Sequence, residues 1–308
     1  MNAPQISVVM SVYNGERYLR SSVESILAQE GCEFEFIVID DGSTDGSPAI
    51  LTEYAARDAR VRVITQENSG LTRALIRGCA EARGEFIARQ DADDVSLPGR
   101  FAKQVEGLAS MRAEIPFVSS WAQAIGPEGE VLSESCPASD STAATKNLMD
   151  GSQGPCGHGT VMMRREAYRA VGGYRWQFYY GQDSDLWIRL AEHGGFAFIP
   201  EVLYQYRVTP ESISLAFRPL QRQFGRIGRR CLQERQTGGD EASLLAEAAA
   251  LRVVRGDERY AKKQSKAAGN FFIGSSLRSR RDPRAAKYLW RAIREEPWRL
   301  RYWLRLLK

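Results

Sequence analysis

The chain has 308 residues, of which 43% are hydrophobic, and its formal net charge is +4. This length is enough for one large domain or two modest ones with a substantial core. No stretch approaches 18 uncharged apolar residues, and the N-terminus lacks the basic start and cleavage site of a signal peptide. We therefore expect a cytosolic protein without a transmembrane helix.

The five cysteines argue against a disulfide framework and against a zinc module. They are odd in number and scattered, and none is spaced as Cys-x-x-Cys. The chain has two histidines, so Cys156 and His158 lack the partners that a metal site needs. We interpret them as a buried thiol and a hydrogen-bonded loop histidine.

The net charge hides an asymmetry along the chain. Residues 1–214 contain 19 Lys and Arg against 29 Asp and Glu, whereas residues 215–308 contain 23 against 9. Such a split predicts two regions that face different partners, an acidic domain over 1–214 and a basic helical region over 215–308.

The first hundred residues alternate short apolar runs with segments of helical periodicity. The runs that predict strands are ISVVMSV (6–12), FEFIVID (34–40), VRVIT (61–65) and EFIARQ (85–90). This alternation predicts an α/β fold with a parallel sheet and helices on both faces. Ligands bind such sheets at the carboxyl ends of the strands, so Asp40 and Asp41 should share one edge with the aspartates at 91–94.

From about residue 116 to 207 the pattern becomes mixed. PFVSSWAQAI and VLSES flank GPEGE like a hairpin, and TVMMR and FAFIPEVLYQYRV are further predicted strands. Between the last two, GQDSDLWIRLAEHGG predicts a helix that glycine ends. We expect this half to extend the same sheet.

Beyond residue 215 strand patterns give way to helices rich in Arg, Ala and Leu, with predicted breaks at TGGDE and near GNFFIGSS. The final segment, DPRAAKYLWRAIREEPWRLRYWLRLLK, mixes large apolar residues with arginines. Three interpretations stay open: helices that pack on the main domain, one unit of a tetratricopeptide-like repeat, and a helix on a membrane surface.

The segment RQDADD places three carboxylates within four positions at a predicted strand end. Asp91 and Asp93, two apart in extended chain, should point the same way, and Asp-x-Asp suits a divalent cation such as Mg²⁺ or Mn²⁺. Asp94 should point elsewhere and cap the helix that Pro98 introduces. The pattern alone is weak, because Asp183 and Asp185 repeat it.

Five ordered segments carry a resemblance to a known family: ISVVMSVYNGERYLRSSVESILAQ, FEFIVIDDGSTDGS, ENSGLTRAL, ARGEFIARQDADDVSLPGRF and GQDSDLWIRL. Over about residues 5–215 the chain resembles the family 2 glycosyltransferases. The resemblance implies the GT-A fold, a Rossmann-like nucleotide-diphospho-sugar transferase domain with a mixed, mainly parallel sheet. It also implies inverting, metal-dependent transfer of a sugar from a nucleoside diphosphate.

Position by position, the resemblance implies a donor site. Ser11 and Tyr13 would line the nucleotide pocket, and Asp41 would accept a hydrogen bond from the base. Asp91 and Asp93 would address the ribose and the diphosphate bound to Mn²⁺ or Mg²⁺. UDP is the favoured carrier, before GDP and dTDP. An alternative for Tyr13 is a half-buried aromatic at the sheet end.

Asp183 falls where the family has its catalytic base, with a helix N-cap as the alternative. Two positions depart from the family pattern: Ile76 replaces asparagine, and Gln182 replaces an acidic residue whose charge would help to raise the pKa of Asp183. Asp40 is expected to cap the turn in DGST.

Three further residues of this half have other expected roles. Trp187 and Arg189 are expected in packing and on a solvated helix face. Arg207 is either a phosphate ligand or a surface arginine.

Other functions fit less well. A dinucleotide-dependent oxidoreductase would need Gly-x-Gly-x-x-Gly after the first strand, where VYNGER stands. The Gln-x-x-Arg-Trp signature of processive synthases is absent from the sequence, which favours addition of a single sugar. The alternative is a catalytically silent nucleotide-sugar-binding or scaffold protein.

The partners expected are a sugar donor, a glycan or lipid-linked acceptor and, through 215–308, the cytosolic face of a membrane. Nucleic acid is disfavoured. A basic region that only packs and dimerises is the plainer alternative to membrane contact.

Overall fold

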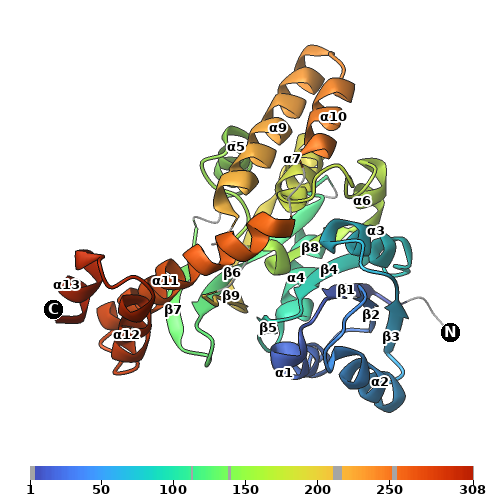
Figure 1. Cartoon of the computed structure of the whole chain (residues 1–308). Coiled ribbons are helices and arrows are strands. Elements are labelled where there is room, and N and C mark those ends of the chain that lie inside the picture. The colour runs from blue at the N-terminus through green and yellow to red at the C-terminus, as the bar shows by residue number, and fades with distance from the viewer. Residues whose placement is uncertain (1–3, 112–113, 138–139, 211–216, 252–254, 308) are drawn as a thin grey trace.

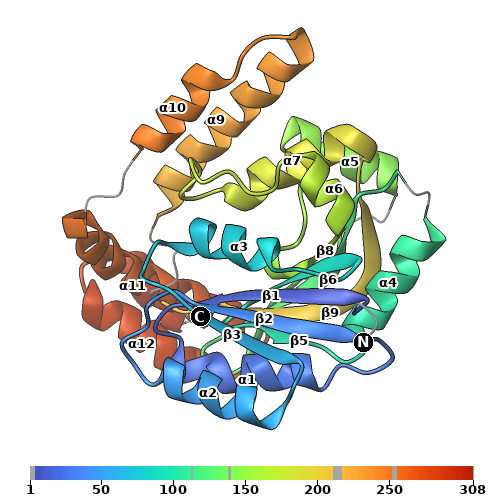
Figure 2. The same cartoon turned by 90° about the vertical axis from the view of Figure 1, so that its right-hand side faces the viewer.

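The computed structural model describes residues 4–111, 114–137, 140–210, 217–251 and 255–307. A curved sheet lies between two layers of helices, and the C-terminal helices form two projections from this body (Figures 1 and 2). The domain boundary that the sequence predicts at residues 214 and 215 lies outside the described residues.

The first half alternates strand and helix as predicted. Its elements are β1 (Ile6–Val12), α1 (Glu16–Leu27), β2 (Phe34–Asp40), α2 (Ser47–Arg57), β3 (Val61–Thr65), α3 (Leu71–Ala80) and β4 (Phe86–Asp91). β1 pairs in parallel with β2 and β4, and β2 pairs in parallel with β3. Because helices cover both faces, β1 and β2 are mostly apolar and almost wholly buried rather than alternating in exposure.

The second half makes the sheet mixed. Its elements are β5 (Val95–Ser96), α4 (Arg100–Ser110), β6 (Phe117–Ile125), β7 (Val131–Ser135), α5 (Ser141–Asp150), η1 (His158–Thr160), β8 (Val161–Arg164), α6 (Arg165–Ala170), α7 (Gln182–Gly194) and β9 (Ala197–Arg207). The strand order is β3-β2-β1-β4-β8-β6-β9-β5, and β7 forms the predicted hairpin with β6. The predicted extension of the sheet is confirmed.

Two apolar cores fill the space between sheet and helices. One joins α1, α2 and α4 to one face, and the other joins α3, α5 and α7 to the opposite face, as Figure 2 shows for α1 and α2 below the sheet and α3 and α7 above it. α3 approaches β1 closely at Gly78, where a Cβ would lie 2.6 Å from Val9 Cγ1. Ile76, which replaces the family's asparagine, packs at the border of the second core.

The C-terminal helices are α9 (Arg218–Thr237), α10 (Ala242–Ala250), α11 (Arg255–Ser279), α12 (Ala285–Glu295) and α13 (Leu300–Leu307). Gly238, with φ 72°, ends α9 in the segment TGGDE, as predicted. The predicted break near GNFFIGSS is wrong. α11 continues through it because Ala267, Ile273 and Leu277 form one buried stripe at helical spacing.

These helices pack on the main body in two places. α9 and α10 share a core with Phe178 and Tyr180, and α11 and α12 share one with Ala124 and Leu132 of the β6–β7 hairpin. This packing confirms the first of the three sequence interpretations, helices that pack on the main domain. Among the described residues, no helix combines the length and the apolar character that crossing a membrane requires.

Candidate active site

The carboxyl ends of β2, β1 and β4 bring the acidic residues to one edge of the sheet. In the strand registers Val12 pairs with Asp40, and Ser11 pairs with Asp91. The backbone N–H of Asp41 donates to the carbonyl of Val12 at 2.8 Å. The prediction that both acidic clusters share one edge is therefore confirmed.

Asp40 and Asp41 order the loops at this edge. Asp40 Oδ1 accepts from the Ser43 backbone N–H at 3.0 Å, which confirms its expected role in the turn. The buried Asp41 carboxylate accepts from the Ser69 and Gly70 backbone N–H groups at 3.0 and 2.9 Å, and from the Gln66 side chain at 2.7 Å. Asp41 thus fixes the start of α3, which sequence reasoning missed. Its contact with a nucleotide base stays a prediction.

Ser11 and Tyr13 lie on either side of the end of β1. Ser11 is partly buried within the strand, whereas Tyr13 follows it and is 55% exposed. Close to half of the residue is covered, so the alternative of a half-buried aromatic at the sheet end fits this position as well. An exposed aromatic face beside the carboxylate edge is suited to stacking on a nucleobase.

The segment RQDADD turns sharply rather than staying extended. β4 ends at Asp91, and the Asp94 backbone N–H donates to the Asp91 carbonyl at 3.3 Å. Asp94 does not cap α4, whose N-cap is Gly99 and has no side-chain cap. Its Oδ1 instead accepts from the backbone N–H of Arg207 at 2.7 Å, and this bond ties the turn to β9.

The aspartates of this turn influence one another. Burial raises the pKa of Asp93 to about 6, and the neighbouring Asp91 carboxylate adds to the increase. Burial, together with Asp93 and Asp91, also raises the pKa of Asp94 well above its usual value. These carboxylates destabilise one another as anions, so a cation placed between them would be attracted strongly.

Asp91 and Asp93 fit one kind of metal site. Within the described ranges, no group of three His, Cys, Asp or Glu side chains is placed to hold an ion. One oxygen of Asp91 also accepts from Arg89 Nη2 at 2.5 Å. Mg²⁺ and Mn²⁺ can use one or two protein carboxylates and take their remaining ligands from substrate phosphates and water. The residues present fit such an ion and not a cage made of protein ligands alone.

Arg89 is a buried cation beneath the edge that sequence reasoning missed. Its side chain is 1% exposed, and Nη1 donates to the Val9 carbonyl at 3.1 Å. Burial, with a contribution from Arg89, lowers the pKa of His158 well below its usual value. His158 Nε2 lies 2.6 Å from the Tyr174 hydroxyl, which confirms the expected hydrogen bond, although His158 begins η1 rather than lying in a loop.

Asp183 lies in the first turn of α7, and Gly181 is the N-cap of that helix. The alternative of Asp183 as N-cap is therefore wrong. Burial raises the pKa of Asp183, and the Asp91 carboxylate adds to the increase. The hydrogen bond that Asp183 accepts from the Ser184 backbone N–H acts in the opposite direction and lowers it. The like charge missing at Gln182 is thus supplied from β4, by a residue far away in sequence.

The rival pair Asp183 and Asp185 does not form a second Asp-x-Asp site. Asp185 is buried and accepts from Arg189 Nη2 at 2.6 Å. Arg189 is buried too, so its expected place on a solvated face is wrong, because the ion pair neutralises it inside the core. Trp187 packs in the apolar core, as expected.

Arg207 joins the acidic turn to the rest of the sheet. Its Nε donates to the Asp93 carbonyl at 2.9 Å, its Nη1 donates to the Gly126 carbonyl at 3.1 Å, and its guanidinium lies over the Tyr18 ring. Both sequence interpretations, a phosphate ligand and a surface arginine, miss this role. Arg207 holds the backbone of the turn, and two loops distant in sequence meet on it.

Comparisons with known proteins agree with this geometry. The family model described as "Glycosyl transferase family 2" matches residues 7–172. EpsE of Bacillus subtilis, named as a glycosyltransferase, is 36% identical over 213 residues, which cover 67% of this chain and 74% of EpsE.

Solved structures share the fold at low sequence identity. The Staphylococcus aureus TarS 1–349 complex with UDP aligns with a TM-score of 0.55 and 15% identity, covering 94% of this chain and 88% of that one. The Pyrobaculum calidifontis mannosyltransferase complex with GDP-Man and Mn²⁺ aligns with a TM-score of 0.57 and 17% identity, covering 99% and 84%. Sheet, acidic edge, family model and relatives agree, and the chain belongs to glycosyl transferase family 2 as a glycosyltransferase with the GT-A fold.

Proposed function

We propose that the protein transfers a single sugar, with inversion, from a nucleoside diphosphate sugar to a hydroxyl group of a glycan or lipid-linked acceptor. One observation carries the proposal: Asp183 is close enough to Asp91 for that carboxylate to raise its pKa, although the two are 92 positions apart in the sequence. If Asp91 binds the donor and Asp183 is the base, the two carboxylates would face one reaction space. UDP is the favoured carrier, and the TarS complex with UDP supports it.

The donor would bind along the carboxyl edge of the sheet. The exposed Tyr13 ring would stack on the base, with Ser11 and Asp41 beside it, and Asp91 would contact the ribose. Asp93 and Asp91 would hold Mn²⁺ or Mg²⁺, and the mannosyltransferase complex with Mn²⁺ supports this assignment. The cation supplies positive charge against the charge that develops on the leaving diphosphate.

Asp183 would accept the proton of the attacking acceptor hydroxyl. A general base works best when its pKa lies near the working pH, and both burial and Asp91 move Asp183 in that direction. Only the ionised carboxylate can take the proton, so the transfer rate should rise with pH through the pKa of Asp183. A single displacement of this kind inverts the anomeric carbon.

The test separates binding from transfer. Calorimetry with a panel of nucleoside diphosphate sugars, with Mn²⁺, with Mg²⁺ and with chelator, should give metal-dependent binding of one donor that Asp93→Ala abolishes. Asp183→Asn should keep donor binding and lose transfer by about 10²–10⁴-fold. Donor binding by the wild type without transfer to any acceptor would favour the alternative, a silent nucleotide-sugar-binding or scaffold protein.

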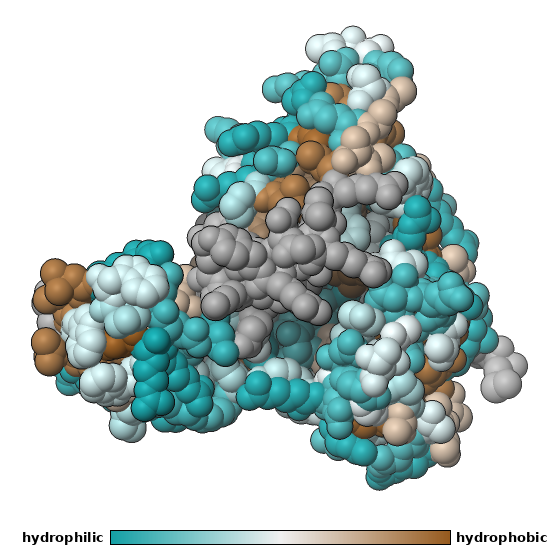
Figure 3. Space-filling model, in the orientation of Figure 1, coloured by the Kyte–Doolittle hydropathy of each residue, from teal (hydrophilic) through white to brown (hydrophobic). Residues whose placement is uncertain are grey.

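A specific observation also favours membrane contact through the C-terminal helices. Trp298, Leu300 and Leu307 are 74%, 70% and 80% exposed at the end of the chain. Residues 280–307 contain nine Lys and Arg against three Asp and Glu. Figure 3 shows hydrophobic surface gathered over α13 with hydrophilic surface beside it. Exposed Trp and Leu among arginines suit the interface of an anionic membrane.

Flotation of the full chain with phosphatidylcholine vesicles, with and without phosphatidylglycerol, tests this contact. Binding should need the anionic lipid and should weaken about tenfold in Trp298→Ser/Leu307→Ser, because each apolar side chain buried in lipid contributes binding free energy. Trp176→Ser, a change at an exposed Trp of the main body, is the control. Equal binding to neutral vesicles, or an equal loss in the control, would contradict membrane contact through α13.

A further inference from the structure

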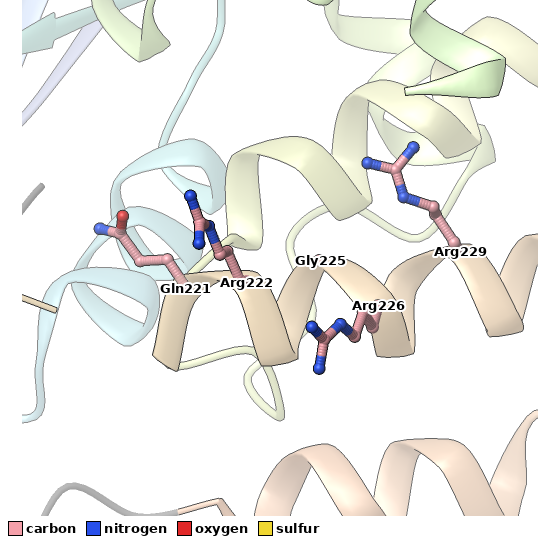
Figure 4. A pocket seen from close by; sticks show the side chains of 5 residues that line it. All are labelled: Gln221, Arg222, Gly225, Arg226 and Arg229. Carbon is pink, nitrogen blue, oxygen red and sulfur yellow. The ribbon is translucent and has the colours of Figure 1, made fainter. Parts of the chain in front are cut away.

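A row of arginines on α9 lines a pocket that the reaction described above does not use. The pocket is formed by Gln221, Arg222, Gly225, Arg226 and Arg229, which follow one face of the helix (Figure 4). We call these residues the α9 arginine row. Gly225 lacks a side chain at its centre, and a Cβ there would have no atom within 4 Å. The pocket is therefore open, and three cations surround it.

Two of the three charges of the row lack an acidic partner among the described residues, and the third, that of Arg229, lies near the exposed Asp150 carboxylate. In the part of the chain that the structure describes, Arg222 and Arg226 are exposed and form no ion pair or hydrogen bond, and Arg229 donates to the backbone carbonyl of Asp150 at 3.0 Å. Two other arginines of the same helix behave differently: Arg230 pairs with Glu247 at 2.7 Å, and Arg235 pairs with Glu192 at 2.5 Å. The row is the part of α9 that keeps its charge available.

The row adjoins the helix that carries the candidate base. A Cβ on Gly181, the N-cap of α7, would lie 3.4 Å from Phe224 Cβ and 3.9 Å from the backbone nitrogen of Gly225. Phe224 is fully buried, and its ring lies 6.1 Å from that of Phe178, in the segment that leads into α7. α9 therefore packs against the start of α7, two residues before Asp183, and turns its arginines outward beside that point.

We propose that the α9 arginine row is an acceptor subsite that binds phosphate or carboxylate groups of an anionic acceptor glycan, an inference that rests on the proposed sugar transfer. An acceptor that reaches Asp183 meets Asp91 and Asp93, which repel an anion. Cations next to the start of α7 offset that repulsion and hold the acceptor chain outside the donor site. Guanidinium groups suit this task, because their planar donors bind carboxylate and phosphate oxygens in pairs.

Fluorescence anisotropy of labelled hexagalacturonate, a carboxylate probe, with the full chain tests the subsite. Arg222→Gln/Arg226→Gln should weaken binding about tenfold, since two charge-assisted contacts are lost. The matched control is Arg280→Gln/Arg281→Gln, which removes the same charge from two exposed arginines elsewhere and should change binding less than about twofold. Competition by tripolyphosphate and by maltohexaose separates phosphate, carboxylate and neutral sugar recognition.

A second variant keeps the test valid if Arg222→Gln/Arg226→Gln does not fold. Gly225→Gln fills the pocket without changing its charge, and it should weaken hexagalacturonate binding while the helix stays intact. Binding of UDP with Mn²⁺ should be unchanged in every variant. A loss of UDP binding in Arg222→Gln/Arg226→Gln would assign the row to the donor and overturn the proposal, as would an equal loss in the control. If the wild type binds no donor, the proposed transfer fails, whatever the row binds.

Discussion

The acidic edge of the sheet and the basic C-terminal helices differ in how they use their charges. At the edge, the Asp41 carboxylate accepts several hydrogen bonds, Asp94 is bonded to β9, and Asp91 is paired with a buried arginine. On α9, and near the end of the chain, Arg222, Arg226, Arg280 and Arg281 are exposed to solvent. The acidic edge holds its charges in hydrogen bonds and ion pairs, whereas these arginines of the C-terminal helices are accessible to solvent and to ligands.

This difference follows from where each charge lies. A carboxylate buried at a sheet edge must have a partner, because an unpaired buried charge costs several kcal/mol. An exposed guanidinium pays no such cost, so a helix surface can keep it free for a ligand. In the function that we propose, reaction geometry would belong to the acidic edge, and attraction of partners would belong to the basic helices. Changes at the edge should alter stability and catalysis together, whereas changes to the exposed arginines of the helices should alter binding alone.

Of the variants that test this contrast, Arg207→Met is expected to have the largest effect on stability. The variant keeps the aliphatic stem but loses the donors to the carbonyls of Asp93 and Gly126. The free energy of unfolding should fall by about 2–3 kcal/mol, because two partly buried carbonyl groups lose charge-assisted hydrogen bonds. Urea denaturation measures it. Metal-dependent donor binding should weaken as well, since the turn that carries Asp93 loses its support.

Arg77→Met is the matched control for that variant. Arg77 is an exposed arginine on α3 whose side chain donates to Gln66 at 3.2 Å, and its loss should change stability by less than about 0.5 kcal/mol. If the two variants lose the same free energy of unfolding, the contrast between a hydrogen-bonded arginine of the edge and an exposed arginine does not hold.

A smaller effect is expected from Asp93→Asn, and it depends on pH. The folded pKa of Asp93 is raised to about 6, so the folded state holds its proton longer than the unfolded chain does. Stability from this group is present below its ordinary pKa, is lost as pH rises through about 6, and stays lost above that value. In chelator, Asp93→Asn should therefore raise the free energy of unfolding at about pH 8 by about 1–2 kcal/mol and change it little at about pH 4.

Asp58→Asn should show the opposite sign. A hydrogen bond from Arg60 lowers the pKa of Asp58, so that carboxylate stabilises the fold above its ordinary pKa and loses this contribution only as pH falls below it. The variant should be less stable at about pH 8 than the wild type. An Asp93→Asn protein that is also less stable at that pH would contradict the mutual repulsion of the acidic turn.

The fold and the acidic character of the edge could be predicted from the sequence, but the residues that hold the edge in place could not. Strand and helix patterns placed β1 to β4 and the hairpin, because apolar periodicity is local. The turn after Asp91, the bond from β9 to Asp94 and the buried Arg89 depend on residues that meet only in the folded chain. Arg89 and Arg207 show no periodicity or motif that separates them from surface arginines. Likewise, the continuity of α11 through GNFFIGSS depends on a buried face that the two glycines do not interrupt.

The smallest expected effect on stability is at the contact between α12 and the β6–β7 hairpin, where the two regions meet. The Tyr288 hydroxyl of α12 donates to Glu130 Oε1 at 2.7 Å, and both residues are buried against the β6–β7 hairpin. Tyr288→Phe leaves that oxygen unpaired and should lower the free energy of unfolding by about 1–2 kcal/mol. Tyr302→Phe is the control, because its bond to Glu296 at 2.9 Å stays within the C-terminal helices. If the basic helices are a structural part of the enzyme, hydrogen exchange in Tyr288→Phe should speed up in β7 and α11 together. Faster exchange in α11 with β7 unchanged would make the helices an independent unit that only presents charge.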